Sequence, residues 1–163
     1  MPGFTFTIRK AGAAEAADAF ALIEEYYEQV GVMVRDIRAE LEHHLSADGS
    51  GIWLAWSDSN ITETPPRERP IGCILLRPLT SIRDAGEIKR LYVRRPFRGF
   101  GVAQALLLAL EKYAAAHGIV SLYLDSKQDL QAAIRFYERS GYCPCERYND
   151  NPQATIFMRK QLL

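Results

Sequence analysis

The pattern of apolar and polar positions along the chain predicts about seven strands. A strand is indicated where apolar and polar side chains alternate, or where a short apolar run lies between turn residues. Phe4-Thr5-Phe6-Thr7-Ile8-Arg9 shows the alternation, and Ile71-Gly72-Cys73-Ile74-Leu75-Leu76 shows the apolar run of a buried strand. Residues 57–69 are rich in Pro, Thr, Asp and Asn, which is typical of a loop. The strands are expected at residues 4–9, 51–56, 71–76, 87–93, 120–124, 142–148 and 154–159.

Helices are predicted where apolar residues recur every three or four positions. They are expected at residues 13–30, 35–45, 101–117 and 129–140. The third has the most regular stripe, with Val102, Leu106 and Leu110 on one face, and Gly118 is expected to end it. The order of elements is therefore βααβββαβαββ. This order predicts a single α/β (α+β) domain over residues 1–163, in which a mixed sheet carries helices on both faces.

The charge of the chain gives no sign of a polyanionic partner. Lys plus Arg equals Asp plus Glu at 20 each, so no net field favours nucleic acid or an anionic membrane. The longest apolar stretch, at 102–110, is interrupted by Gln104 and is too short to span a bilayer. The first residues lack the basic and apolar regions of a secretory signal. We therefore expect a cytoplasmic protein that binds neither nucleic acid nor membrane.

The cysteines and the paired histidines are not expected to hold a metal. Cys73, Cys143 and Cys145 cannot all pair within one chain, and Cys143-Pro144-Cys145 has one intervening residue where the usual redox motif has two. We interpret the three as structural thiols in a reducing compartment. His43 and His44 are adjacent on a predicted helix, so their side chains face different ways and do not form a ligand pair.

A Gly-containing segment joins the strand predicted at 87–93 to the helix predicted at 101–117. It reads Arg98-Gly99-Phe100-Gly101-Val102-Ala103. A helix N-terminus has unpaired N–H groups and a dipole that favours an anion, and Arg98 adds a charge suited to a pyrophosphate. The segment lacks the Gly-Lys-Ser or Gly-Lys-Thr of a Walker loop. It also has Ala103 where a dinucleotide fingerprint has its third glycine.

A second cluster lies later in the chain, where Ala133-Ile134-Arg135-Phe136-Tyr137-Glu138-Arg139-Ser140-Gly141-Tyr142 reads as a helix, a Gly stop and a strand. The two clusters, in this order, resemble the acyl-CoA motif and the following helix of the GNAT superfamily of N-acetyltransferases. Arg98, Gly101 and Ala103 match its pattern of Arg or Gln, two residues, Gly, one residue, then Gly or Ala. The order of elements is similar to that fold over nearly the whole chain. Leu130 departs from the pattern, since many members have Asn there.

The resemblance implies acetyl-CoA as the acyl donor, with no metal ion. In the family the donor lies where two central parallel strands separate, and Leu91-Tyr92-Val93 corresponds to one of these strands. The N–H of Leu91 is expected to hold the thioester carbonyl, and that of Val93 a pantetheine amide. Fixed donors of this kind stabilise a developing oxyanion. The expected cofactor-binding residues are Leu91, Tyr92, Val93, Arg98, Gly99, Phe100, Gly101, Val102 and Ala103.

The resemblance also implies two residues that move protons. Glu87 corresponds to the general base, acting through water, and Tyr137 to the tyrosine that donates to the departing thiolate. Two alternatives stay open at this point. Glu87 is either a base or a side chain that is solvated or paired with Lys89, and a close Lys would lower its pKa and weaken it as a base. Tyr137 is either a proton donor or a packed aromatic of the helix.

The implied function is that of a cytoplasmic acyltransferase, which moves an acetyl group from acetyl-CoA to a primary amine of a small molecule or peptide in a ternary complex. A non-catalytic CoA-binding sensor and a transferase of a longer acyl group are the alternatives. The fold is compatible with a homodimer, although no strand indicates an interface. The basic run 89–98 would suit nucleic acid, but its place beside the Gly-containing segment favours the phosphates of CoA.

The acceptor amine is expected to enter opposite CoA, over the loop that joins the first two helices and over the late strands. Aromatic and polar groups that gather there suit a small polar amine. The tyrosines are alternatively core residues, because Tyr27 falls on the apolar stripe of its helix. The expected substrate-binding residues are Tyr26, Tyr27, Arg35, Tyr148 and Asn149.

Overall fold

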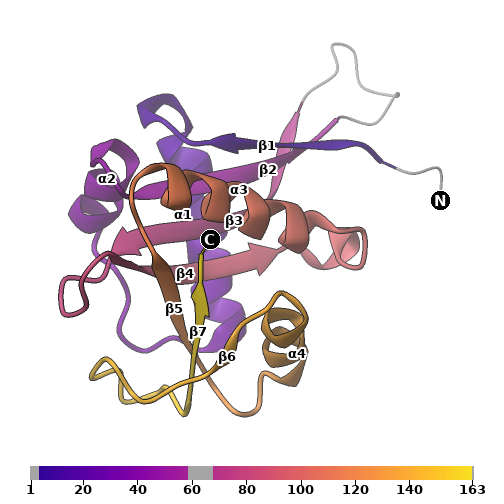
Figure 1. The fold of residues 1–163 in the computed structure, drawn as a ribbon. Coiled ribbons are helices and arrows are strands. Elements are labelled where there is room, and N and C mark those ends of the chain that lie inside the picture. Colours follow the sequence, from indigo (N-terminus) through magenta and orange to yellow (C-terminus); the bar gives the residue numbers. More distant parts are fainter. Residues whose placement is uncertain (1–3, 59–67, 163) are drawn as a thin grey trace.

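The computed structural model describes residues 4–58 and 68–162 of the chain. Within them one mixed sheet is covered by helices on both faces (Figure 1). The helices are η1 (Ala13–Glu15), α1 (Ala16–Val30), α2 (Arg38–Ser46), η2 (Arg95–Phe97), α3 (Val102–Ala116) and α4 (Gln131–Arg139). The strands are β1 (Phe6–Lys10), β2 (Gly51–Ser57), β3 (Arg69–Pro78), β4 (Ala85–Val93), β5 (Ser121–Ser126), β6 (Cys143–Pro144) and β7 (Ile156–Gln161). The fold class and the order of elements expected from the sequence are confirmed.

The sheet has the strand order β1-β2-β3-β4-β5-β7-β6. Its neighbours pair antiparallel except β4 and β5, which are parallel because α3 connects them as a crossover. In this strand order the single parallel pair lies at the centre of the sheet.

Of the loop predicted at 57–69, residues 59–67 lie outside the described part of the chain, while Ser57 ends β2 and Arg69 begins β3.

Two cores lie on the two faces of the sheet, and β2 shows how the sequence divides between them. Ile52 and Leu54 face the core formed with α1 and α2, whereas Trp53 and Ala55 face the core formed with α3. Alternate residues of a strand point to opposite faces, so a strand covered on both sides is apolar throughout. Figure 1 shows α3 in front of the sheet and α1 behind it.

A bulge distorts β4 and separates it from β5. Cys73 on β3 pairs with Tyr92, but Leu75 pairs with Lys89, so one residue of β3 lies opposite two residues of β4. Arg90, at the bulge, has a φ of 58°, in the left-handed region. Pairing between β4 and β5 runs from Ala85 to Glu87 on β4, although β4 itself continues to Val93. The parallel pair therefore opens beyond Glu87 into a fork.

The second helix begins later than the apolar pattern predicts. The prediction placed it at 35–45, but α2 spans Arg38–Ser46. Ile37 is extended, and its N–H donates to Glu40 Oε2 at 3.2 Å, which caps the helix at this position. Asp36 is held away from the helix by the Tyr27 hydroxyl, which donates to Asp36 Oδ2 at 2.7 Å. A tertiary contact thus fixes the start of α2.

The strand predicted at 142–148 is wrong in extent, since only Cys143–Pro144 pairs with β7. The residues that follow form a compact loop. Arg147 donates to the carbonyl oxygens of Asn151 and Ala154 at 3.2 and 3.0 Å, so the chain curls around its guanidinium. The loop satisfies its own backbone in this way, and it brings polar side chains to the fork.

Candidate active site

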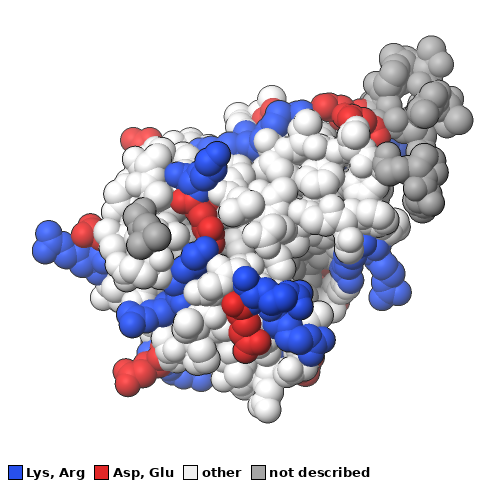
Figure 2. Space-filling model, turned by 45° about the vertical axis from the view of Figure 1, so that its right-hand side comes forward, with Lys and Arg blue, Asp and Glu red and all other residues white. Residues whose placement is uncertain are grey.

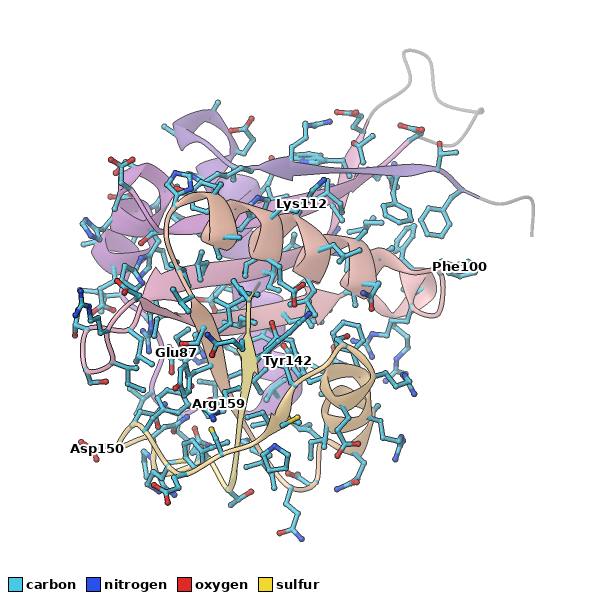
Figure 3. The ribbon with its side chains drawn as sticks, in the orientation of Figure 1. Glu87, Phe100, Lys112, Tyr142, Asp150 and Arg159 are labelled. Carbon is cyan, nitrogen blue, oxygen red and sulfur yellow. The ribbon has the colours of Figure 1, made fainter. Side chains whose placement is uncertain are left out.

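Glu87 lies at the base of the fork and is 1% exposed. Its Oε1 accepts a hydrogen bond from Arg77 Nε at 2.7 Å, and its Oε2 accepts one from the Tyr148 hydroxyl at 2.7 Å and one from Asn149 Nδ2 at 3.1 Å. A buried carboxylate needs partners of this kind, because burial without them costs several kcal/mol. Figure 3 shows Glu87 on β4, inside the molecule rather than on its rim.

A second buried carboxylate, Asp125 at the end of β5, lies beside Glu87. Asp125 Oδ2 is 2.8 Å from Lys89 Nζ and accepts from Asn149 Nδ2 at 2.6 Å. Lys89 Nζ is 3.5 Å from Glu87 Oε2, so this ammonium lies between the two carboxylates. The pairing of Glu87 with Lys89 that the sequence left open is therefore present, but the shorter contact of Lys89 is with Asp125.

The loop after β6 presents this polar cluster through two successive Asn turns. Asn149 Oδ1 accepts from the Asn151 N–H, and Asn151 Oδ1 accepts from the Gln153 N–H, both at 3.1 Å. The amide nitrogens are then free to donate inward, from Asn149 to Glu87 and Asp125 and from Asn151 to Asp125. Gln153 extends the same loop to the connection between α1 and α2, where it accepts from the Met33 N–H at 2.9 Å. The loop is thus fixed at both ends before any ligand binds.

The cluster shifts the ionisation of its members in opposite directions. Burial alone would raise the pKa of Asp125, but the Lys89 ammonium and the amides of Asn149 and Asn151 outweigh it and hold the pKa below its usual value. Burial, reinforced by the Glu87 carboxylate, raises the pKa of Tyr148 well above its usual value. Asp125 is therefore anionic and Tyr148 neutral throughout the physiological range.

Stability at low pH depends on this arrangement. The folded-state pKa of Asp125 is depressed, so its contribution to stability is present above about pH 4 and is lost as the pH falls through the folded value. We expect Asp125→Asn to lower the free energy of unfolding at pH 7 by about 3 kcal/mol, because Lys89 loses a buried partner. We also expect it to remove part of the loss of stability that the native protein shows between pH 5 and pH 2.

Chemical denaturation at a series of pH values measures both effects. Asp150→Asn is the matched control, because Asp150 lies in the same loop with an exposed carboxylate. Equal pH profiles for the native protein and Asp125→Asn would contradict the assignment.

Backbone donors line the fork. The Arg94 N–H donates to Ile71 O on β3 at 2.8 Å, so the N–H of Val93, one residue earlier, faces the opposite side of β4. The carbonyl of Val93 also lies on that side, where it accepts from Arg98 Nε at 2.7 Å. Tyr92 pairs with Cys73 on β3, and Leu91 lies between this pair and Arg90, at the bulge. The Val93 N–H therefore points into the fork, and the direction of the Leu91 N–H stays a prediction.

The bulge that creates the fork is anchored from outside the sheet. Arg90 Nε lies 2.9 Å from Asp36 Oδ2, and its guanidinium lies 5.0 Å from the centre of the Tyr27 ring. Burial would raise the pKa of Asp36, but Arg90 outweighs it and keeps the carboxylate ionised. A non-Gly residue at positive φ costs about 1 kcal/mol or more, and the largely buried ion pair with Asp36 holds Arg90 in that conformation.

A cavity of about 250 Å³ lies where η2 and the following loop meet α3 and α4. Gly99 and Gly101 have φ of 83° and 86°, and a Cβ added to either would meet nothing within 4 Å. The loop backbone is therefore open to a ligand, in a conformation that favours glycine. Figure 3 shows Phe100, between these glycines, at the outer tip of the loop. The cavity is lined by Val93, Phe97, Arg98, Gly99, Gly101, Val102, Ala103, Gln104, Phe136 and Arg139.

Tyr137, the predicted proton donor, lies on the inner face of α4. Its ring packs edge-on against Phe136 and Tyr142, with centroids 5.2 and 5.5 Å away. Burial raises the pKa of Tyr137 well above its usual value, so the hydroxyl stays protonated. Its hydroxyl makes no hydrogen bond within residues 4–58 and 68–162. Tyr137 is thus a packed aromatic of the helix, and its role as a proton donor stays a prediction.

The five predicted acceptor residues do not lie together. Tyr148 and Asn149 contact Glu87, as described above. Tyr26 lies 5.7 Å from the Arg90 guanidinium. Tyr27 is 1% exposed and belongs to the core, so its hydroxyl serves Asp36 rather than open space. Arg35 pairs with Glu24 and Glu28 on the outer face of α1, away from the cluster. The geometry therefore brings Tyr148 and Asn149 together at Glu87, and it places Tyr26 with Tyr27 at Arg90 and Arg35 on the outer face of α1.

Three members of the polar cluster escaped the sequence analysis. Asp125 follows a buried strand and begins the turn to a helix, a place where functional side chains are common, and that signal was available. Asn151 lies in the segment 147–152, over which the acceptor is expected to enter, but it is not among the expected substrate-binding residues. Arg77 comes to Glu87 through the register of β3 and β4, which the sequence does not show.

The three cysteines form no disulfide in the part of the chain that the structure describes. Cys73, Cys143 and Cys145 are free, and burial raises the pKa of the Cys73 thiol to about 12. Among the described residues no group of three or more His, Cys, Asp or Glu side chains is placed to hold a metal ion. The helices in the same part of the chain are too short or too polar to cross a membrane.

Comparison with known proteins defines the class that this fold and site represent. The sequence model of the acetyltransferase (GNAT) family matches residues 17–142. The chain therefore belongs to the GNAT family. An uncharacterised N-acetyltransferase of Schizosaccharomyces pombe is 28% identical over 146 residues, which cover 86% of this chain and 85% of that protein.

Two solved structures share the fold. An acetyltransferase of the GNAT family from Staphylococcus aureus has a TM-score of 0.77 and 16% identity, over 98% of this chain and all of the other. The PaiA N-acetyltransferase of Thermoplasma acidophilum, solved in complex with coenzyme A, has a TM-score of 0.71 and 16% identity, over 96% and 99% of the two chains. At these identities the likeness concerns the fold.

Proposed function

We propose that the protein is an N-acetyltransferase that moves the acetyl group of acetyl-CoA to a primary amine of a small molecule or peptide, by direct attack in a ternary complex. The observation that carries the proposal is the fork between β4 and β5. At one end it meets the glycine loop and its cavity, and at the other it meets the buried carboxylate of Glu87. A thioester bound along β4 would therefore lie between a phosphate site and a base.

The residues present fit the CoA molecule. The backbone at Gly99 and Gly101 faces open space at the N-terminus of α3, where a pyrophosphate is favoured. The Val93 N–H faces the fork and would hold a pantetheine amide, and the N–H of Leu91, at the bulge, would hold the thioester carbonyl. Acetyl-CoA supplies the activated acetyl group, and the protein supplies oriented donors that stabilise the developing negative charge.

Proton transfer falls to Glu87 and Tyr137. A bond forms between the amine nitrogen and the acetyl carbon while the carbon–sulfur bond breaks. Glu87 accepts the proton that the amine loses. Because its carboxylate is 1% exposed, the proton passes through an intervening water, as the resemblance implied. Tyr137 donates its hydroxyl proton toward the departing sulfur, and solvent restores both groups.

The acceptor is expected to lie over the polar cluster. Asn149 and Tyr148 both contact the base, so an amine beside them would be within reach of proton transfer. Tyr26, next to the bulge, is the third acceptor residue that we retain. A CoA-binding sensor would need only the loop and its cavity. The buried polar cluster behind the fork supports an enzyme.

Acetyl transfer to a panel of primary amines tests the proposal. The release of free thiol from acetyl-CoA is followed with each amine present and absent, and the mass of the acceptor identifies the product. We expect amine-dependent thiol release with an acetylated amine as product. Binding of CoA without amine-dependent release, over a panel that includes amino acids, polyamines, arylalkylamines and peptides, would favour the sensor.

A further inference from the structure

Arg98, the cation of the glycine loop, lines the cavity but is held by protein partners. Arg98 Nε donates to Val93 O at 2.7 Å, and its Nη2 donates to Gln29 Oε1 on α1 at 3.0 Å. Its guanidinium lies 5.8 Å from the centre of the Tyr92 ring. Arg98 therefore braces the loop against β4 and α1, and two of its three nitrogen atoms are engaged in that brace.

Arg94, the neighbouring cation, is also engaged. Arg94 Nη2 lies 2.6 Å from Glu25 Oε1, its Nε lies 3.0 Å from Glu25 Oε2, and its Nη1 donates to Pro70 O at 2.8 Å. The bidentate ion pair with Glu25 and the hydrogen bond to Pro70 together use all three nitrogen atoms of the guanidinium. The loop side of the cavity thus offers backbone N–H groups to an anion, but its arginines are largely committed to protein partners.

Arg139 lines the same cavity from the opposite side. It is an exposed residue in the last turn of α4, and it forms no ion pair with any residue that the structure describes. Figure 2 shows several groups of Lys and Arg side chains on the side of the molecule that it presents, some beside Asp or Glu and others surrounded by uncharged surface. An unpaired guanidinium across a cavity from open N–H groups is an arrangement suited to a phosphate.

We propose that the Arg139 guanidinium contacts a phosphate group of CoA, and that Arg98 acts as a structural brace rather than as the main phosphate cation. The inference rests on the proposed use of CoA. Two phosphate sources share this chemistry, the pyrophosphate and the 3′-phosphate. The glycine loop and α4 then hold CoA from two sides, and α4 serves both ends of the molecule, with Tyr137 toward the sulfur and Arg139 toward the phosphates.

Calorimetric titration with CoA and with 3′-dephospho-CoA tests the inference. Arg139→Ala is expected to raise the Kd for CoA about ten-fold, which corresponds to about 1.4 kcal/mol. Arg139→Lys should recover part of the loss, because it restores the charge without the fork of donors. The ratio of the Kd of Arg139→Ala for CoA to that of the native protein should fall at high salt, because salt screens a solvent-exposed charge contact. Arg135→Ala is the matched control, an exposed arginine of the same helix outside the cavity lining.

The outcomes separate the possibilities. A ten-fold loss with both ligands assigns Arg139 to the pyrophosphate, and a loss with CoA alone assigns it to the 3′-phosphate. A Kd for Arg139→Ala within two-fold of the native value, or an equal loss in Arg135→Ala, would overturn the inference and leave the proposed function standing. Native protein that binds neither ligand would overturn the proposed function itself.

Discussion

Glu87→Gln is expected to lower kcat by about 10²- to 10⁴-fold, the range that general base catalysis contributes. The amide has a similar shape but takes no proton, so the acceptor amine would have to lose its proton to solvent. Binding of CoA should be unchanged, because the glycine loop and its cavity lie at the other end of β4. Steady-state kinetics with an amine identified in the panel, together with calorimetric titration of CoA, measure the two quantities separately.

Glu111→Gln is the matched control. Glu111 accepts from a tyrosine hydroxyl, that of Tyr142, at 2.9 Å and lies 3.1 Å from Lys160 Nζ, so it has the same kinds of partner as Glu87. It lies on α3, outside the polar cluster. We expect it to lower the melting temperature while kcat stays within two-fold. Equal losses of kcat in the two variants would show that Glu87 acts through stability and not as a base.

Tyr137→Phe is expected to lower kcat by about 10²-fold with little change in stability. The hydroxyl has no hydrogen-bond partner among the described residues, so its removal costs no protein contact. Its effect on turnover should be greatest with acetyl-CoA and smaller with a donor whose leaving thiol has a lower pKa, because such a thiolate needs less help from an acid. Single-turnover kinetics with the two donors measure this difference.

Tyr142→Phe controls for the loss of a buried hydroxyl. Its ring packs against that of Tyr137, but its hydroxyl donates to Glu111, away from the fork. It should destabilise the protein by about 1 kcal/mol and leave kcat unchanged. We therefore expect Tyr137→Phe to lose activity but little stability, and Tyr142→Phe to lose stability but not activity. A Tyr137→Phe variant with native turnover would assign Tyr137 to packing alone.

The fold was predictable because its signals are local. The stripe of Val102, Leu106 and Leu110 is set by the period of a helix, and the apolar run of β2 by burial on both faces. Gly99 and Gly101 mark the loop in the same local way. The boundaries that failed were set by distant partners. The start of α2 is delayed because Asp36 binds the Tyr27 hydroxyl and Arg90. The chain curls around Arg147 where a strand was expected.

The candidate site was predictable only in part, for the same reason. Glu87 and Tyr137 were found by resemblance to a family motif. Their surroundings depend on the register of β3 and β4, which brings Arg77 to Glu87, and on the bulge at Arg90, which no residue type in the sequence announces. The sequence identified Arg98 as a phosphate cation because of its place in the motif. The sequence does not show that Arg98 binds Gln29, because Gln29 lies on α1, far away along the chain.

Thermal unfolding in the presence of acetyl-CoA, CoA or ADP is the measurement that tests the central claim most directly. A ligand present at one hundred times its Kd stabilises the folded state by about 2.7 kcal/mol, which raises the midpoint by several degrees for a chain of this size. The account predicts a clear rise with both CoA species and little with ADP, because the fork must hold pantetheine as well as phosphate. No rise with either CoA species at millimolar concentration would contradict it.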